Sequence, residues 1–93
     1  MLFEIISSKK IEKQFSELDD KLKSKFFEFL VCLKTDPVPT NKYDIKKIFG
    51  SKSTFRARIQ KHRIIYEINW NEKRIFLLKF DKRKDRTYKK IWS

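Results

Sequence analysis

The chain has 93 residues, 40% of them hydrophobic and 15% aromatic, which is enough for one compact domain but leaves no room for a second. A single cysteine excludes an internal disulfide, so the fold cannot depend on one. The net charge of +12 is uneven: residues 1–50 carry 10 basic and 8 acidic groups (+2) and residues 51–93 carry 14 and 4 (+10), which favours a polyanionic partner such as nucleic acid, an anionic membrane surface or an acidic protein segment.

The first half of the chain predicts a short strand followed by two helices. Residues 2–6 (LFEII) have the composition of a strand, and Ser7 and Ser8 offer hydroxyl caps for a helix beginning near residue 9. Apolar residues then recur at spacings of three and four, as one helical stripe should: Ile11, Phe15, Leu18, Leu22, Phe26, Phe29, Leu30 and Leu33.

Two aspartates divide this stripe into a helical hairpin. Asp19 and Asp20 have good N-cap chemistry, so we expect helices over about 9–18 and 20–34. Proline cannot continue a helix, and the segment TDPVP therefore ends the second one.

The second half predicts three strands after a polar connection. Residues 40–53 contain Gly50, the only glycine, and we expect a turn there. Residues 54–59, 62–70 and 74–80 are rich in β-branched and aromatic residues and are separated by short polar turns. The expected order is βααβββ in one α+β domain over 1–93, with the helical hairpin on one face of a mainly antiparallel sheet.

Three arginines are expected to share one face of this sheet. Arg56 and Arg58 alternate with apolar residues, and a two-residue turn at residues 60–61 would set Arg58 directly opposite Arg63. Like charges in that position cost about 0.2 to 1 kcal/mol, which suggests an external anion that compensates. A solvated, solubilising face is the alternative, and Arg56 and Arg58 alone do not decide between the two interpretations.

The C-terminal segment KRKDRTYKK combines cations with an aromatic ring. Such a mixture suits RNA, because the cations can hold phosphates and the ring of Tyr88 can stack on an unpaired base. A disordered cationic tail is the alternative reading of the same composition. The candidate RNA-binding residues are Lys82, Lys84, Arg86, Lys89 and Lys90, with Arg83 among them.

Other kinds of site have little support in the sequence. His62 lies at the expected hairpin corner, where it could titrate near neutrality, but we expect an exposed turn residue. Without HExxH, a cysteine cluster or a second histidine, we expect neither a metal nor a cofactor. No apolar run approaches the ~20 residues of a membrane span, so we expect no membrane partner and a cytoplasmic protein.

RNA cleavage would not require many acid-base groups. The neighbouring 2′-hydroxyl of RNA is the attacking group, so a protein needs to orient it, stabilise charge at the phosphorus and manage proton transfers. Arginines suit the second task through bidentate contacts to phosphate oxygens.

The stretch FRARIQKHRIIY, followed by EINWNEKRIFLLKF and KRKDRTY, resembles the C-terminal half of RelE-type toxins, particularly the archaeal ones. With the DPVP segment and the helical pair before it, the resemblance covers nearly the whole chain. It implies the fold expected above, and a toxin of a type II toxin-antitoxin system that cleaves messenger RNA in the ribosomal A site. Its partner would be an acidic RelB-like antitoxin.

The resemblance also implies roles for individual residues. Arg56 and Arg58 match the family's paired basic residues, Arg63 and Arg83 match its phosphate-binding arginines, and Tyr88 matches the tyrosine that stacks on RNA. One of the paired positions is often a lysine suspected as the general base, whereas both are arginine here, so the base is unassigned. Arg86 or Lys82 could take the place given to Arg83. A ParE-like toxin that binds DNA gyrase without cutting RNA, and a generic nucleic-acid or membrane-binding module, remain the alternatives.

Overall fold

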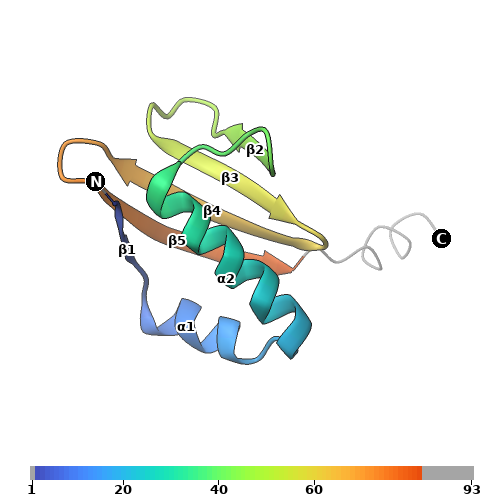
Figure 1. Ribbon diagram of the computed structural model, residues 1–93. Helices are drawn as coiled ribbons and strands as arrows, with labels where there is room; N and C mark the ends of the chain where they lie inside the picture. Colours follow the sequence, from blue (N-terminus) through green and yellow to red (C-terminus); the bar gives the residue numbers. More distant parts are fainter. Residues whose placement is uncertain (1, 83–93) are drawn as a thin grey trace.

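A computed structural model describes residues 2–82 as a five-stranded sheet with two helices on one side (Figure 1). The strand order is β1-β5-β4-β3-β2; β1 runs parallel to β5 and every other pair is antiparallel. In chain order the elements are β1 (Glu4–Ile6), α1 (Lys9–Ser16), α2 (Asp20–Thr35), β2 (Asp44–Lys47), β3 (Thr54–Ile59), β4 (His62–Asn69) and β5 (Arg74–Lys82).

The helix caps are the ones that the sequence predicts. The hydroxyl of Ser8 accepts a hydrogen bond from the backbone N–H of Ile11, and the carboxylate of Asp19 accepts one from Leu22. The predicted α+β class, helical hairpin and mainly antiparallel sheet are confirmed.

The order βααβββ is wrong by one strand, because residues predicted to be a loop form β2. This strand has four residues, DIKK, of which only Ile45 is buried. Its local composition therefore carries no strand signal, and it is held by antiparallel pairing with β3. The other boundaries differ by small amounts: α1 ends at Ser16, and β5 continues to Lys82.

The core lies between α2 and the facing side of the sheet. Phe26, Phe29 and Leu33 of α2 are almost fully buried, and they meet the inward side chains of β4 and β5. Tyr66 on β4 is also fully buried, and its hydroxyl donates a 2.8 Å hydrogen bond to the carbonyl of Pro37. This bond connects the central strand β4 to the segment that follows α2.

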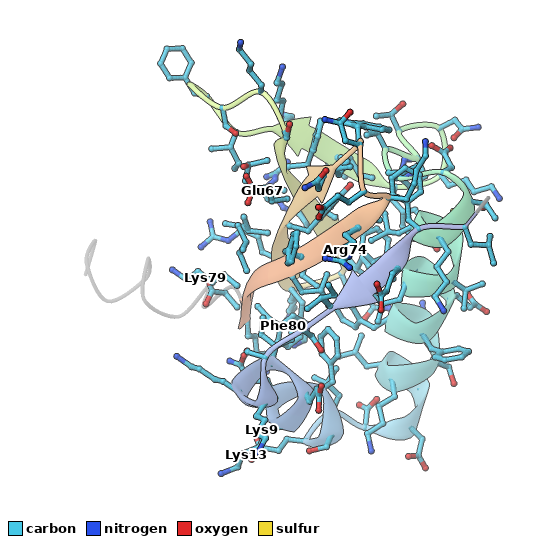
Figure 2. All side chains as sticks on the ribbon, turned by 90° about the vertical axis from the view of Figure 1, so that its left-hand side faces the viewer. Lys9, Lys13, Glu67, Arg74, Lys79 and Phe80 are labelled. Carbon is cyan, nitrogen blue, oxygen red and sulfur yellow. The ribbon has the colours of Figure 1, made fainter. Side chains whose placement is uncertain are left out.

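Helix α1 covers the part of β5 that β1 does not pair with. β1 pairs only with residues 74–76, and further along β5 the side-chain amide of Gln14 donates to the carbonyl of Phe80 (3.1 Å). The Phe15 and Phe80 rings also meet edge to face, 4.8 Å apart, and Figure 2 shows Phe80 between the sheet and α1. Within residues 2–82, neither helix combines the length and apolarity needed to cross a membrane.

Candidate functional site

A row of four charged residues crosses the face of the sheet that points away from the helices. Direct partners in adjacent antiparallel strands lie side by side on one face, and the register is Asp44 to Arg58, Arg58 to Arg63, and Arg63 to Asp81. The predicted juxtaposition of Arg58 and Arg63 is confirmed. We call these four residues the arginine row, and its charges follow the order minus, plus, plus, minus.

The two outer carboxylates contact the arginines. Asp81 Oδ2 lies 3.3 Å from Arg63 Nη2, and the two oxygens of Asp44 lie 3.4 Å from Arg56 Nη2 and 3.9 Å from Arg58 Nη1. The like-charge pairing is therefore compensated within the chain by Asp44 and Asp81, a contribution that neither interpretation, an external anion or a solvated face, had anticipated. Sequence reasoning missed both aspartates, because Asp44 lies in the segment taken for a loop and Asp81 follows the predicted end of its strand.

A second row beside the first adds positive charge. Lys46 lies opposite Arg56, Arg56 opposite Ile65, and Ile65 opposite Lys79. Figure 2 shows Lys79 and Glu67 on the side of the sheet away from α2. The arginine face, as we call the two rows together, holds five cations (Lys46, Arg56, Arg58, Arg63 and Lys79) and two carboxylates.

The three arginines differ in their exposure. The side chain of Arg63 is 49% exposed and that of Arg58 38%, whereas Arg56 is only 15% exposed and its Nε has no hydrogen-bond partner among residues 2–82. Of these three arginines, Arg58 and Arg63 are thus the ones that an external ligand can reach most directly.

The arginine face has the chemistry of a phosphate-binding surface. Half-exposed ion pairs of this kind contribute only about 0 to 1 kcal/mol each, so a phosphate can displace the carboxylates at small cost. A guanidinium fork also matches the oxygens of a phosphate in a bidentate arrangement. The excess of cations over carboxylates favours such an anion.

The last residue of β5 lies next to the arginine row. Lys82, the last described residue, is exposed and lies opposite His62, one position beyond the pair of Arg63 and Asp81. The remaining predicted site residues lie outside the described residues: Arg83, Lys84, Arg86, Tyr88, Lys89 and Lys90.

The expectation that His62 is an exposed turn residue is wrong. Its register opposite Ile59 turns it toward the helices, and its ring stacks on Phe80 (5.3 Å) and meets Phe26 edge to face (5.7 Å). Burial lowers the pKa of His62 and Lys82 lowers it further, while Asp19 opposes them. A neutral imidazole in the core, on the side of the sheet opposite the arginine row, is a packing residue. Among residues 2–82, no three metal-binding side chains gather at one place.

Sequence comparisons show which known proteins this chain is similar to. Residues 5–87 match the family model described as the ParE toxin of the type II toxin-antitoxin system parDE. The chain is 35% identical over 83 residues to a Methanocaldococcus jannaschii protein that is named as a toxin, RelE1, covering 89% of this chain and 92% of that protein.

Solved structures of similar proteins share the fold. The archaeal RelE in a RelE-RelB complex from Pyrococcus horikoshii superposes with a TM-score of 0.83 and 32% identity, over 91% of this chain and 99% of the other. The isolated Escherichia coli RelE toxin superposes with a TM-score of 0.74 over 99% and 96% of the two chains, but at 14% identity its likeness concerns the fold alone.

Proposed function

Because the chain belongs to the RelE/ParE family of type II toxin-antitoxin toxins, we propose that it is a ribosome-dependent endoribonuclease that cleaves messenger RNA in the ribosomal A site and so inhibits translation. The observation that carries this proposal is the pair of accessible guanidinium groups, Arg58 and Arg63, side by side on a face with more cations than carboxylates. A protein that only binds another protein does not require that arrangement.

The proposed reaction uses the RNA's own nucleophile. The 2′-oxygen forms a bond to the adjacent phosphorus while the bond from phosphorus to the 5′-oxygen breaks, which yields a 2′,3′-cyclic phosphate and a 5′-hydroxyl. One proton leaves the 2′-hydroxyl, and one arrives at the 5′-oxygen. Negative charge grows on the phosphate oxygens in the transition state, and positioned cations that meet it accelerate the step.

The site residues that the sequence predicts receive the following roles in this proposal. Arg63 holds the scissile phosphate together with Arg83 from the segment after β5, while Arg56 or Arg58 lies near the 2′-hydroxyl. Tyr88 stacks on a base, and the nearby basic residues hold neighbouring phosphates: Lys82, Lys84, Arg86, Lys89 and Lys90.

A proton acceptor is the part that the arginines cannot supply, since guanidinium groups stay protonated in proteins. Asp44 has its carboxylate oxygens 3.4 and 3.9 Å from the guanidinium groups of Arg56 and Arg58. We assign to it the removal of the proton from the 2′-hydroxyl, because it is the carboxylate beside the position proposed for that group.

The partner that restrains the toxin is, in this proposal, an acidic RelB-like antitoxin. The protein of Pyrococcus horikoshii and a similar one from Methanococcus jannaschii were solved as complexes of RelE with RelB. A net charge of +12 also favours an acidic partner, whose association rate should fall as salt is added. An association rate that does not change with salt would contradict this electrostatic account.

One alternative has a specific observation behind it, since the matching family model is that of the ParE toxin. A ParE-like toxin would bind DNA gyrase and would not cut RNA. The experiment that separates the two incubates the purified protein with programmed ribosomes, with free messenger RNA and, in parallel, with gyrase and plasmid. Cleavage that requires ribosomes and leaves 5′-hydroxyl ends supports the proposal, whereas inhibition of supercoiling without cleavage would replace it by the alternative.

A further inference from the structure

We propose that the tip of the loop between β2 and β3 is a second RNA contact, in which the ring of Phe49 stacks on an unpaired base and neighbouring lysines hold the adjoining phosphates. The inference deepens the proposed function, because it takes RNA as the ligand of this protein. Its centre, Phe49, is not part of the arginine face.

The exposure of Phe49 is the first observation. Its relative exposure is 101%, so it contacts nothing beyond its immediate chain neighbours, whereas burying a phenylalanine side chain is favourable. Such a ring gains from any partner that covers it, and a nucleobase offers a flat face of matching size.

The loop that carries the ring is held in place by its own hydrogen bonds. The backbone N–H of Ile48 donates to the carbonyl of Thr54 (2.8 Å), and that of Ser51 donates to the carbonyl of Ile48 (3.1 Å). The Ser51 hydroxyl also accepts from the backbone N–H groups of Ser53 and Thr54, at 3.3 and 3.1 Å. A ring presented on a closed turn loses less freedom on binding than one on a loose loop.

Gly50 makes this turn tight. Its φ of 84° lies in the left-handed region, which glycine enters without steric cost. Phe49 directly precedes this left-handed residue.

The charge of the loop indicates the kind of partner. Residues 45–53 contain Lys46, Lys47 and Lys52 and no acidic residue, and none of these lysines is within ion-pair distance of a carboxylate in residues 2–82. Lys46, on β2, is also one of the cations of the arginine face, so the loop that follows β2 adjoins that positive surface. Lysines around an exposed aromatic ring are the combination that binds single-stranded nucleic acid.

A protein partner fits this tip less well. Protein interfaces centre on several apolar side chains that together exclude water, and charged residues are depleted there. Phe49 stands among lysines, and two of the other large exposed apolar side chains, Phe27 and Val31, belong to α2. An isolated ring in a cationic setting matches a base and its phosphates.

The contact is distant from the proposed reaction centre. Thr54, next to the loop, is four positions before Arg58 of the arginine row, a span of about 13 Å along a β-strand. Phe49 should therefore contribute to RNA affinity and not to the rate of bond breaking. The base belongs either to the messenger or to ribosomal RNA.

The test measures binding of RNA that cannot be cut. The probe is a single-stranded messenger fragment with 2′-O-methyl groups, which lack the attacking hydroxyl, either free or placed as messenger on ribosomes. We expect Phe49→Ala to weaken binding about 10-fold, equivalent to about 1.4 kcal/mol, which lies within the range of one base stacked on an aromatic ring. Phe49→Trp should restore binding. Phe27→Ala, which removes a phenylalanine that is 69% exposed on α2, is the matched control and should bind like wild type.

The outcomes are separable. Weakening with both forms of the probe supports stacking on the messenger, and weakening on ribosomes alone supports stacking on ribosomal RNA. Unchanged RNA binding by folded Phe49→Ala overturns the inference, as does a loss confined to binding of the antitoxin. If wild type binds RNA through Phe49 but never cuts it, the proposed function fails and the contact remains.

Discussion

Replacing Arg63 by alanine tests the arginine row while leaving the fold intact. The side chain is 49% exposed, so its ion pair with Asp81 contributes about 0.2 to 1 kcal/mol. The variant also relieves the like-charge pairing with Arg58, which costs about 0.2 to 1 kcal/mol. The two effects oppose each other, and the net change in unfolding free energy should be smaller than about 1 kcal/mol, or less than roughly 4 to 8 °C in melting temperature.

The effect on cleavage should be far larger. Arg63→Ala removes a planar donor pair from a phosphate whose charge increases in the transition state, and loss of one such donor slows comparable reactions about 100-fold or more. RNA binding should weaken much less, because the other cations of the face remain. Arg63→Lys keeps the charge and loses the fork, so it should recover only part of the rate.

The assay is single-turnover cleavage of messenger RNA on programmed ribosomes, with thermal melting of each variant. Arg74→Ala is the matched control, because Arg74 is a 46% exposed arginine on β5 that also contacts carboxylates, Glu4 and Glu72, at 3.5 and 3.4 Å. Figure 2 shows its place beside β1. Arg74→Ala should cut like wild type. Wild-type cleavage by folded Arg63→Ala protein would refute the catalytic role.

Three further predictions concern single residues. Asp44→Asn removes the proposed proton acceptor and one negative charge, so RNA should bind at least as tightly while single-turnover cleavage slows by about 100-fold or more; an unchanged rate would leave Asp44 as an ion-pair partner only. Tyr66→Phe leaves the carbonyl of Pro37 without its 2.8 Å donor, so the free energy of unfolding, measured in urea, should fall by about 1 to 2 kcal/mol. An unchanged free energy of unfolding would show that the carbonyl finds another partner. Burial lowers the pKa of His62, so the unfolded chain takes up a proton first as the pH falls, and the folded state should lose stability below about pH 6.5. In His62→Phe, the melting temperature should decrease less between about pH 7 and 5 than in wild type. An unchanged pH profile would show that His62 does not cause the loss of stability.

Several features of the fold follow from local sequence. The hydroxyl of Ser8 and the carboxylate of Asp19 can cap only helices that begin just after them, and the apolar spacing determines which side of each helix is buried. The strict alternation in β3 and a two-residue turn suffice to pair Arg58 with Arg63, because a slip by one residue would expose the apolar set. These are short-range constraints, so the sequence alone was enough to predict them.

The environment of the arginines was decided by tertiary structure. β2 has one buried residue and forms by pairing with β3, a contact that brings Asp44 to Arg56 and Arg58 from 12 and 14 positions earlier in the chain. Asp81 reaches Arg63 only because β5 extends beside β4. The local sequences DIKK and FDK do not predict the ion pairs of Asp44 and Asp81, because each carboxylate contacts a residue of another strand.

The same distinction separates His62 from Phe49. By residue type, the histidine was expected in solvent and a phenylalanine would ordinarily be buried, yet His62 is 7% exposed and Phe49 is 101% exposed. His62 is buried because its register points it at Phe26 and Phe80 under the helices, and Phe49 is exposed because it lies in a turn after the last residue of β2 that pairs with β3. Composition sets what a side chain gains from burial, and only the packing of distant segments decides whether anything is there to bury it.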